Sequence, residues 1–151
     1  MEMMNFEGPG FTLQVPSNWF ITSTPQIQAM FVAPPRKGGR ANFMVTLRPV
    51  EKDVTLDQVV QTSLDTMQKE YAQFELLQAG EYQKGDLIGH QRLYTWFSKE
   101  HNAPILQRQV IFIADQILYT LTTTRVNISS LEDLDAVFEQ MIASFQFVEG
   151  S

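Results

Sequence analysis

The sequence contains no cysteine and few charged residues. Without thiols the chain can form neither disulfide bonds nor thiolate sites, which is compatible with a reducing compartment. Charged residues make up 19% of the 151 positions, against about 25% in typical globular proteins. The net charge is −6, and an acidic protein is repelled by phosphate backbones and by anionic lipids. We therefore expect no nucleic-acid partner.

Long hydrophobic runs and a secretory signal are also missing. Residues 110–114 form one of the longest apolar runs, far short of the roughly 20 residues that span a bilayer. At the N-terminus an acidic residue and then Gly8, Pro9 and Gly10 stand where a signal needs positive charge and an apolar core. We expect the chain as given to be cytoplasmic and not to insert into a membrane, although removal of a leader would leave a sequence that looks the same.

Side chains suited to catalysis or metal binding are scarce. His90 and His101 have no second histidine or carboxylate at metal-ligand spacing. The sequence has no nucleophile elbow, phosphate-binding loop or dinucleotide-binding glycine pattern. We therefore expect no enzymatic activity, no metal and no cofactor, although a carboxylate pair assembled from distant strands would be invisible in the sequence.

Alternation of apolar and polar residues predicts that much of the chain is β-strand. The clearest alternation covers residues 11–15 and 42–48, and a further strand is expected over residues 26–32. Residues 72–97 predict two strands joined near Gly85. Residues 107–125 predict a hairpin, with Asp115 and Gln116 at its tip.

Helical spacing of apolar residues predicts two helices. The first runs from Leu56 to Tyr71 after a capping box formed by Thr55 and Gln58. The second ends near Phe145 and is capped by Ser129 or Ser130. Because long β segments separate the helices, we predict an α+β fold over residues 1–151: one domain, with an antiparallel sheet of about six or seven strands and both long helices packed on one face.

One face of the predicted sheet is polar and almost uncharged. It offers Asn42, Met44, Thr46, Gln107 or Gln109, and Thr120 or Thr122, while the only charged residues of these strands are Arg48, Arg92 and Arg108. Hydroxyl and amide groups cost less free energy to desolvate than ions do, and they can form hydrogen bonds to a bound partner. Met30, Met44 and Met67 would adapt such a surface to varied shapes. A binding groove, the lining of a barrel-like sheet and a dimer interface all remain open.

Five phrases support a resemblance that covers nearly the whole chain: FTLQVPSNW, ANFMVTLRP, LDQVVQTSLDTMQKEYAQFEL, LQRQVIFI and LYTLTTT. They resemble the fold shared by the PsbP proteins of photosystem II and the small Ran-binding proteins. The resemblance is closer to the DcrB-related uncharacterised family, whose cytosolic members include the Eag chaperones of bacterial type VI secretion.

The resemblance implies a homodimeric, non-catalytic chaperone or adaptor. Such a protein shields the apolar, transmembrane-type N-terminal segment of an effector and helps to load it onto a secretion spike protein. The alternative is a PsbP-type protein-binding or assembly module without a secretion role.

The resemblance also implies partner-binding residues. Gln109 stands where the chaperones place a glutamine on the guest, Asn42 and Thr46 stand where they place serines, and Ile27 and Ala29 lie near their apolar groove edge. On the first helix Ser63, Met67 and Tyr71 replace glutamine, alanine and leucine. A Gln109→Glu substitution should then impair guest binding and leave the fold intact, because it puts a charge into a surface meant to be dry.

Overall fold

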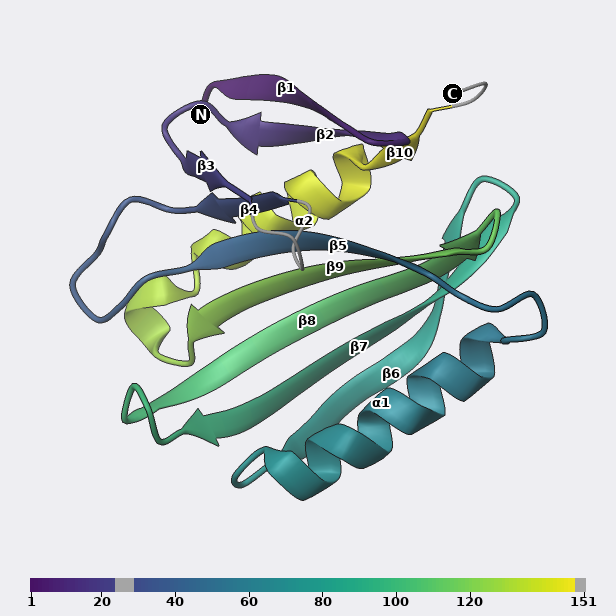
Figure 1. Cartoon of the computed structure of the whole chain (residues 1–151). Coiled ribbons are helices and arrows are strands. Elements are labelled where there is room, and N and C mark those ends of the chain that lie inside the picture. The colour runs from purple at the N-terminus through teal and green to yellow at the C-terminus, as the bar shows by residue number, and fades with distance from the viewer. Residues whose placement is uncertain (24–28, 149–151) are drawn as a thin grey trace.

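Two antiparallel sheets and two helices make up the structure, a computed structural model that describes residues 1–23 and 29–148. The large sheet has seven strands in the order β3-β4-β5-β9-β8-β7-β6, and the small sheet has the order β1-β2-β10 (Figure 1). The large-sheet strands are β3 (Phe20–Thr22), β4 (Ala29–Val32), β5 (Asn42–Pro49), β6 (Glu75–Lys84), β7 (Leu87–Ser98), β8 (Ala103–Ala114) and β9 (Ile117–Val126). The other elements are β1 (Met3–Gly8), β2 (Phe11–Pro16), β10 (Gln146–Phe147), α1 (Leu56–Glu70), a 3₁₀ turn (Ser129–Leu131) and α2 (Leu134–Ser144). The predicted α+β class is confirmed.

The hydrophobic core lies between the large sheet, the small sheet and α2. The large sheet contributes Phe31, Phe43, Val110, Phe112 and Leu121, the small sheet Phe11, Leu13 and Val15, and α2 Leu134, Phe138, Met141 and Ile142. Phe145, which follows α2, stacks on Phe11 with 5.3 Å between the ring centroids. Large aromatic side chains thus fill the space between the layers, as expected for the residues that bury the most apolar surface.

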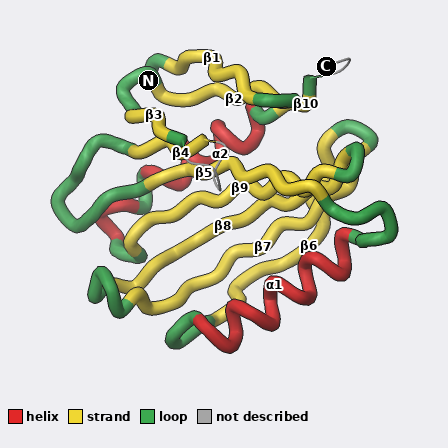
Figure 2. Tube along the Cα trace, viewed as in Figure 1, coloured by secondary structure: helices red, strands yellow, loops and turns green. Residues whose placement is uncertain are grey.

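The two helices lie on opposite faces of the large sheet (Figure 2), whereas we expected both on one face. Arg92 in β7 bonds to α1, and Arg108 in β8 pairs with Glu139 of α2. Arg108 stands opposite Leu93, the neighbour of Arg92, and successive strand residues point to opposite faces. Helical periodicity shows which side of a helix is apolar. It does not show which face of a sheet the helix covers.

The small sheet was missed in the sequence because its turn looked like an interruption. Gly10 has φ +81°, in the left-handed region that glycine adopts freely, and it helps to turn β1 back along β2. The short strands β3 and β10 were also not predicted. The strand expected over residues 26–32 is described only as β4, Ala29–Val32.

The first helix begins as predicted and the second does not. Thr55 Oγ1 accepts a hydrogen bond from the Gln58 amide, and Gln58 Oε1 accepts one from the Thr55 amide, which completes the capping box. Ser129 and Ser130 open the 3₁₀ turn, and α2 starts only after Asp133. The predicted serine cap is therefore wrong.

Neither helix, nor any other helical segment in the described ranges, is long and apolar enough to cross a membrane.

Candidate functional site

The large-sheet face under α1 brings polar side chains from several strands into rows. One row runs across the sheet through Met30, Met44, Thr122, Gln109 and Arg92, each directly opposite the next. Residues opposite one another in antiparallel strands point to the same face. Asn42, Met44, Thr46 and Gln109 therefore share one polar face of the sheet, and Arg92 lies on the same face.

Part of this face, which we call the open strip, lies on the adjacent strands β9, β5, β4 and β3 (Figure 1). Its residues are Phe20, Met30, Asn42, Met44, Thr46, Thr120 and Thr122. None of them carries a charge. Phe20 is 65% exposed, and all the others except Thr122 are partly exposed. The strip is a neutral surface that reaches solvent.

Asn42 carries an unmet hydrogen-bond acceptor in this strip. Its Oδ1 is buried and has no hydrogen-bond partner in the described part of the chain. An unsatisfied buried polar group costs about 1–3 kcal/mol.

Arg92 organises the part of the face that α1 covers. Its Nε and Nη2 donate to Gln109 Oε1 at 2.9 and 2.7 Å, Nη2 also donates to Ser63 Oγ at 2.8 Å, and Nη1 donates to the Val60 carbonyl at 3.2 Å. Gln109 Nε2 in turn donates to Thr122 Oγ1. Both ends of the Gln109 amide are therefore engaged within the protein.

The charge of Arg92 is buried without a carboxylate beside it. Arg92 is only 4% exposed, and none of the ion pairs among the described residues includes Arg92. Burial lowers the pKa of Arg92 from its ordinary value, but an arginine in a protein stays protonated. Burial also raises the pKa of the neighbouring Tyr94 phenol, which therefore stays neutral. Arg92 is an uncompensated cation.

A groove of about 540 Å³, which we call the α1 groove, lies between α1 and the sheet next to Arg92. It is lined by Thr46, Leu47, Arg48, Pro49, Val59, Ser63, Arg92, Ile111, Leu118 and Thr120. The lining contains two arginines and no acidic residue. It adjoins the open strip at Thr46 and Thr120.

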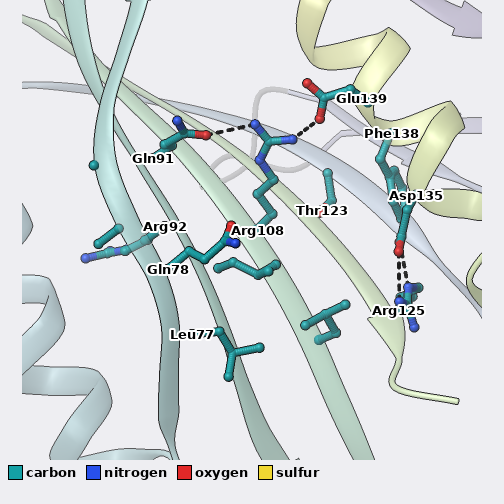
Figure 3. A pocket seen from close by; sticks show the side chains of 14 residues that line it. Leu77, Gln78, Gln91, Arg92, Arg108, Thr123, Arg125, Asp135, Phe138 and Glu139 are labelled. Carbon is teal, nitrogen blue, oxygen red and sulfur yellow. Dashed lines mark hydrogen bonds and ion pairs between the residues drawn. The ribbon is translucent and has the colours of Figure 1, made fainter.

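A second groove, of about 740 Å³, lies on the other face of the sheet beside α2 (Figure 3). Its arginines are paired, Arg125 with both carboxylate oxygens of Asp135 and Arg108 with Glu139 and Gln91. The Arg92 side chain points away from this groove. In this second groove each of these two arginines is paired with a carboxylate, whereas the α1 groove contains arginines and no acidic residue.

The predicted partner-binding residues fall into three groups. The first group lies on the sheet face: Asn42, Met44, Thr46 and Gln109. The second group comes from the α1 side. There Ser63 accepts a hydrogen bond from Arg92, Met67 is buried, and Tyr71 stacks on Trp96 with 4.4 Å between the ring centroids. Ala29 is opposite Val45 and 1% exposed in the core, so its predicted place at a groove edge is wrong. Ile27 lies outside the described residues.

Sequence reasoning did not assign roles to Arg92 and Phe20. The strand register reveals both positions. Arg92 is directly opposite Gln109, and Phe20 is opposite Val32, which is in turn opposite Asn42. No group of three or more metal-ligating side chains occurs within residues 1–23 and 29–148.

Acid should weaken the fold in part through His90. Burial, and then the nearby Arg92, lowers the pKa of His90 in the folded state, so the unfolded chain, with an ordinary histidine pKa of about 6.5, binds the proton more tightly. This contribution to stability is complete above about pH 6.5 and is lost as the pH falls through the folded-state pKa. A His90→Gln variant should lose less stability than the parent between about pH 6.5 and 5 in urea titrations.

The matched control for His90 is His101→Gln, at an exposed position in the turn between β7 and β8. An equal change of slope in both variants would contradict the role given to His90.

Comparisons with known proteins agree with this architecture. The DcrB family model matches residues 12–144. CyanoP, the cyanobacterial PsbP of Synechocystis sp. PCC 6803, is 13% identical with a TM-score of 0.69, over 97% of this chain and 92% of CyanoP. LpqN of Mycobacterium tuberculosis, involved in cell envelope biogenesis, is 13% identical with a TM-score of 0.68, over 97% and 91%. The Ran-binding protein Mog1p of Saccharomyces cerevisiae is 13% identical with a TM-score of 0.65, over 97% of both chains.

Comparison with curated proteins gives no significant match. The structural likenesses confirm the PsbP-like fold that the sequence phrases implied.

Proposed function

Because the chain belongs to the DcrB family, we propose that it is a non-catalytic protein-binding module whose open strip holds an apolar segment of a partner protein. The observation that carries the proposal is the lack of charge on the open strip, a part of the sheet face that reaches solvent. A solvated antiparallel face normally presents polar and charged side chains. The open strip instead presents Phe20, Met30 and Met44 among hydroxyl and amide groups.

The chemistry of the strip suits an apolar helix or strand with occasional polar groups. Methionines adapt to irregular surfaces, and threonine hydroxyls can donate or accept hydrogen bonds. Asn42 Oδ1 is an acceptor without a partner among the described residues. In its full form the proposal is the role of the Eag chaperones: a cytoplasmic homodimer that shields the transmembrane-type segment of a type VI effector and delivers it to the spike protein.

A second candidate is an assembly module that binds a folded partner. Strand β6 forms an edge of the large sheet, and Leu76 and Leu77 on it are 38% and 45% exposed. An exposed edge strand can pair with a strand of another protein. This candidate places the partner at β6 instead of at the open strip.

The test of the proposal is binding of a fluorescent, apolar peptide of transmembrane type, about 20 residues long. The parent protein should keep the peptide in the supernatant after centrifugation and raise its fluorescence anisotropy. Met44→Asp should weaken binding at least about tenfold, because drying an unpaired carboxylate costs several kcal/mol and each factor of ten corresponds to about 1.4 kcal/mol.

The matched control is Thr62→Asp, which adds the same charge at an exposed position on α1. It should bind the peptide like the parent, and circular dichroism should show that both variants are folded. Equal binding by Met44→Asp and the parent would place the peptide elsewhere and overturn the proposal. Failure of the parent to hold the peptide would also overturn it and favour the β6 candidate.

A further inference from the structure

The guanidinium of Arg92 is buried and has no carboxylate beside it among the described residues. Buried charges in proteins are normally paired, because an ion removed from water without a partner is expensive. Around Arg92 the protein supplies only neutral acceptors: Gln109 Oε1, Ser63 Oγ and the Val60 carbonyl. These acceptors orient the guanidinium and leave its charge in place.

The hydrogen bonds of Arg92 also leave one donor over. An arginine side chain has five N–H donors. The N–H of Nε and the two of Nη2 are used, and Nη1 donates only to Val60. One N–H of Nη1 therefore has no acceptor within the described residues.

The space beside Arg92 is suited to a small molecule with an apolar chain. The α1 groove, at about 540 Å³, falls within the range of about 300–1,000 Å³ that is typical of ligand sites. Val59, Ile111 and Leu118 provide apolar walls, while Thr46 and Thr120 provide hydroxyls. Arg48 is a second cation in the lining, and no acidic side chain opposes an anion there.

We propose that the α1 groove binds a medium-chain alkanoate, with its carboxylate on Arg92 and its chain along Val59, Ile111 and Leu118. The ligand supplies the missing negative charge, and its chain buries apolar area against the walls. A charge-assisted contact to carboxylate is among the stronger hydrogen bonds in proteins. The inference does not depend on protein binding at the open strip, because Met44 and Phe20 do not line the groove.

The test uses decanoate below its micelle-forming concentration, with binding followed by calorimetry and by amide chemical shifts. Decanoate should bind the parent, with the largest shifts at Thr46, Ser63 and Thr120. Decanol has the same chain without the charge, and acetate has the charge without the chain. Both should bind at least tenfold more weakly than decanoate. Equal binding of decanol would overturn recognition of the anion, and no binding of decanoate would overturn the site.

Gln109→Glu is the decisive variant. It places a carboxylate where Gln109 Oε1 now contacts Arg92 at 2.7 and 2.9 Å, so the internal acid replaces the ligand's charge. Decanoate affinity should fall at least tenfold. Gln91→Glu is the matched control, because Gln91 Oε1 also accepts a hydrogen bond from an arginine, Arg108, on the other face of the sheet. It should bind decanoate like the parent, and equal loss in both variants would contradict the proposal.

A second variant tests the groove without changing any charge. Val59→Trp puts a larger side chain into the wall at a partly exposed position, and it should reduce decanoate affinity at least tenfold. Met44→Asp should leave decanoate affinity unchanged, which separates this site from the open strip. Unchanged binding in Val59→Trp, or loss in Met44→Asp, would place the alkanoate outside the α1 groove.

Discussion

Replacing Gly89 by alanine should lower the free energy of unfolding by about 3 kcal/mol, the upper part of the range for overpacked interiors. A Cβ built on Gly89 would lie 2.5 Å from the Ile111 carbonyl oxygen and 2.5 Å from Cδ1 of Phe112. The carbonyl belongs to β8, which is paired with β7 on one side and β9 on the other. The backbone therefore cannot give way without breaking the centre of the sheet.

Gly80→Ala is the matched control in the neighbouring strand. Gly80 has no positive φ, and nothing lies within 4 Å of a Cβ built on it. Alanine there should be neutral or should stabilise the protein by up to about 1 kcal/mol, because it restricts the unfolded chain. Urea unfolding of both variants measures the difference. Similar stabilities would show that the sheet yields at Gly89.

The second large effect concerns Gln109→Glu in the absence of ligand. The new carboxylate pairs with the buried guanidinium of Arg92, and the Thr122 hydroxyl can turn to donate to it. Since the cation is already buried, we expect the variant to be about 1–2 kcal/mol more stable than the parent near neutral pH. Urea unfolding at several pH values measures this gain, which should disappear in acid as the carboxylate is protonated.

Gln107→Glu, on the same sheet face, should lower the free energy of unfolding, whereas Gln109→Glu should raise it. Gln107 Oε1 accepts a hydrogen bond from Trp96 Nε1, and its Nε2 donates to Thr124 Oγ1. No cation contacts it in the described part of the chain, so a carboxylate there is buried unpaired. Stability should fall by about 2–4 kcal/mol. Equal losses in the position 107 and 109 variants would show that Arg92 does not act as an uncompensated charge.

Position 109 shows what the sequence could supply and what it could not. Alternation along the strands correctly put Asn42, Met44, Thr46 and Gln109 on one polar face, because the period of two fixes the side of every residue in a strand. On that basis a glutamate at 109 was expected to put an isolated charge into a dry surface. The guanidinium next to Gln109 reverses the electrostatic part of that expectation. The local sequence does not show this neighbour, because only the strand register places Arg92 opposite Gln109.

The errors have similar physical causes. Ala29 was expected near an apolar groove edge, but a shift of one residue turns a strand side chain to the other side of the sheet, and Ala29 is in the core. Both helices were expected on one face of the large sheet, whereas α1 and α2 lie on opposite faces. Each error concerns the relation between segments distant in sequence, which local patterns do not encode.

The small sheet affects how the protein is made. Strand β10 pairs with β2, and Phe145, just before β10, is fully buried against Phe11. During synthesis on a ribosome, the N-terminal strands must therefore wait for residues 145–147 to leave the exit tunnel before their apolar side is covered. Contacts between such distant segments are slow to form. The emerging chain should therefore expose the apolar side chains of Phe11, Leu13 and Val15 to solvent until residues 145–147 have been made and have reached them.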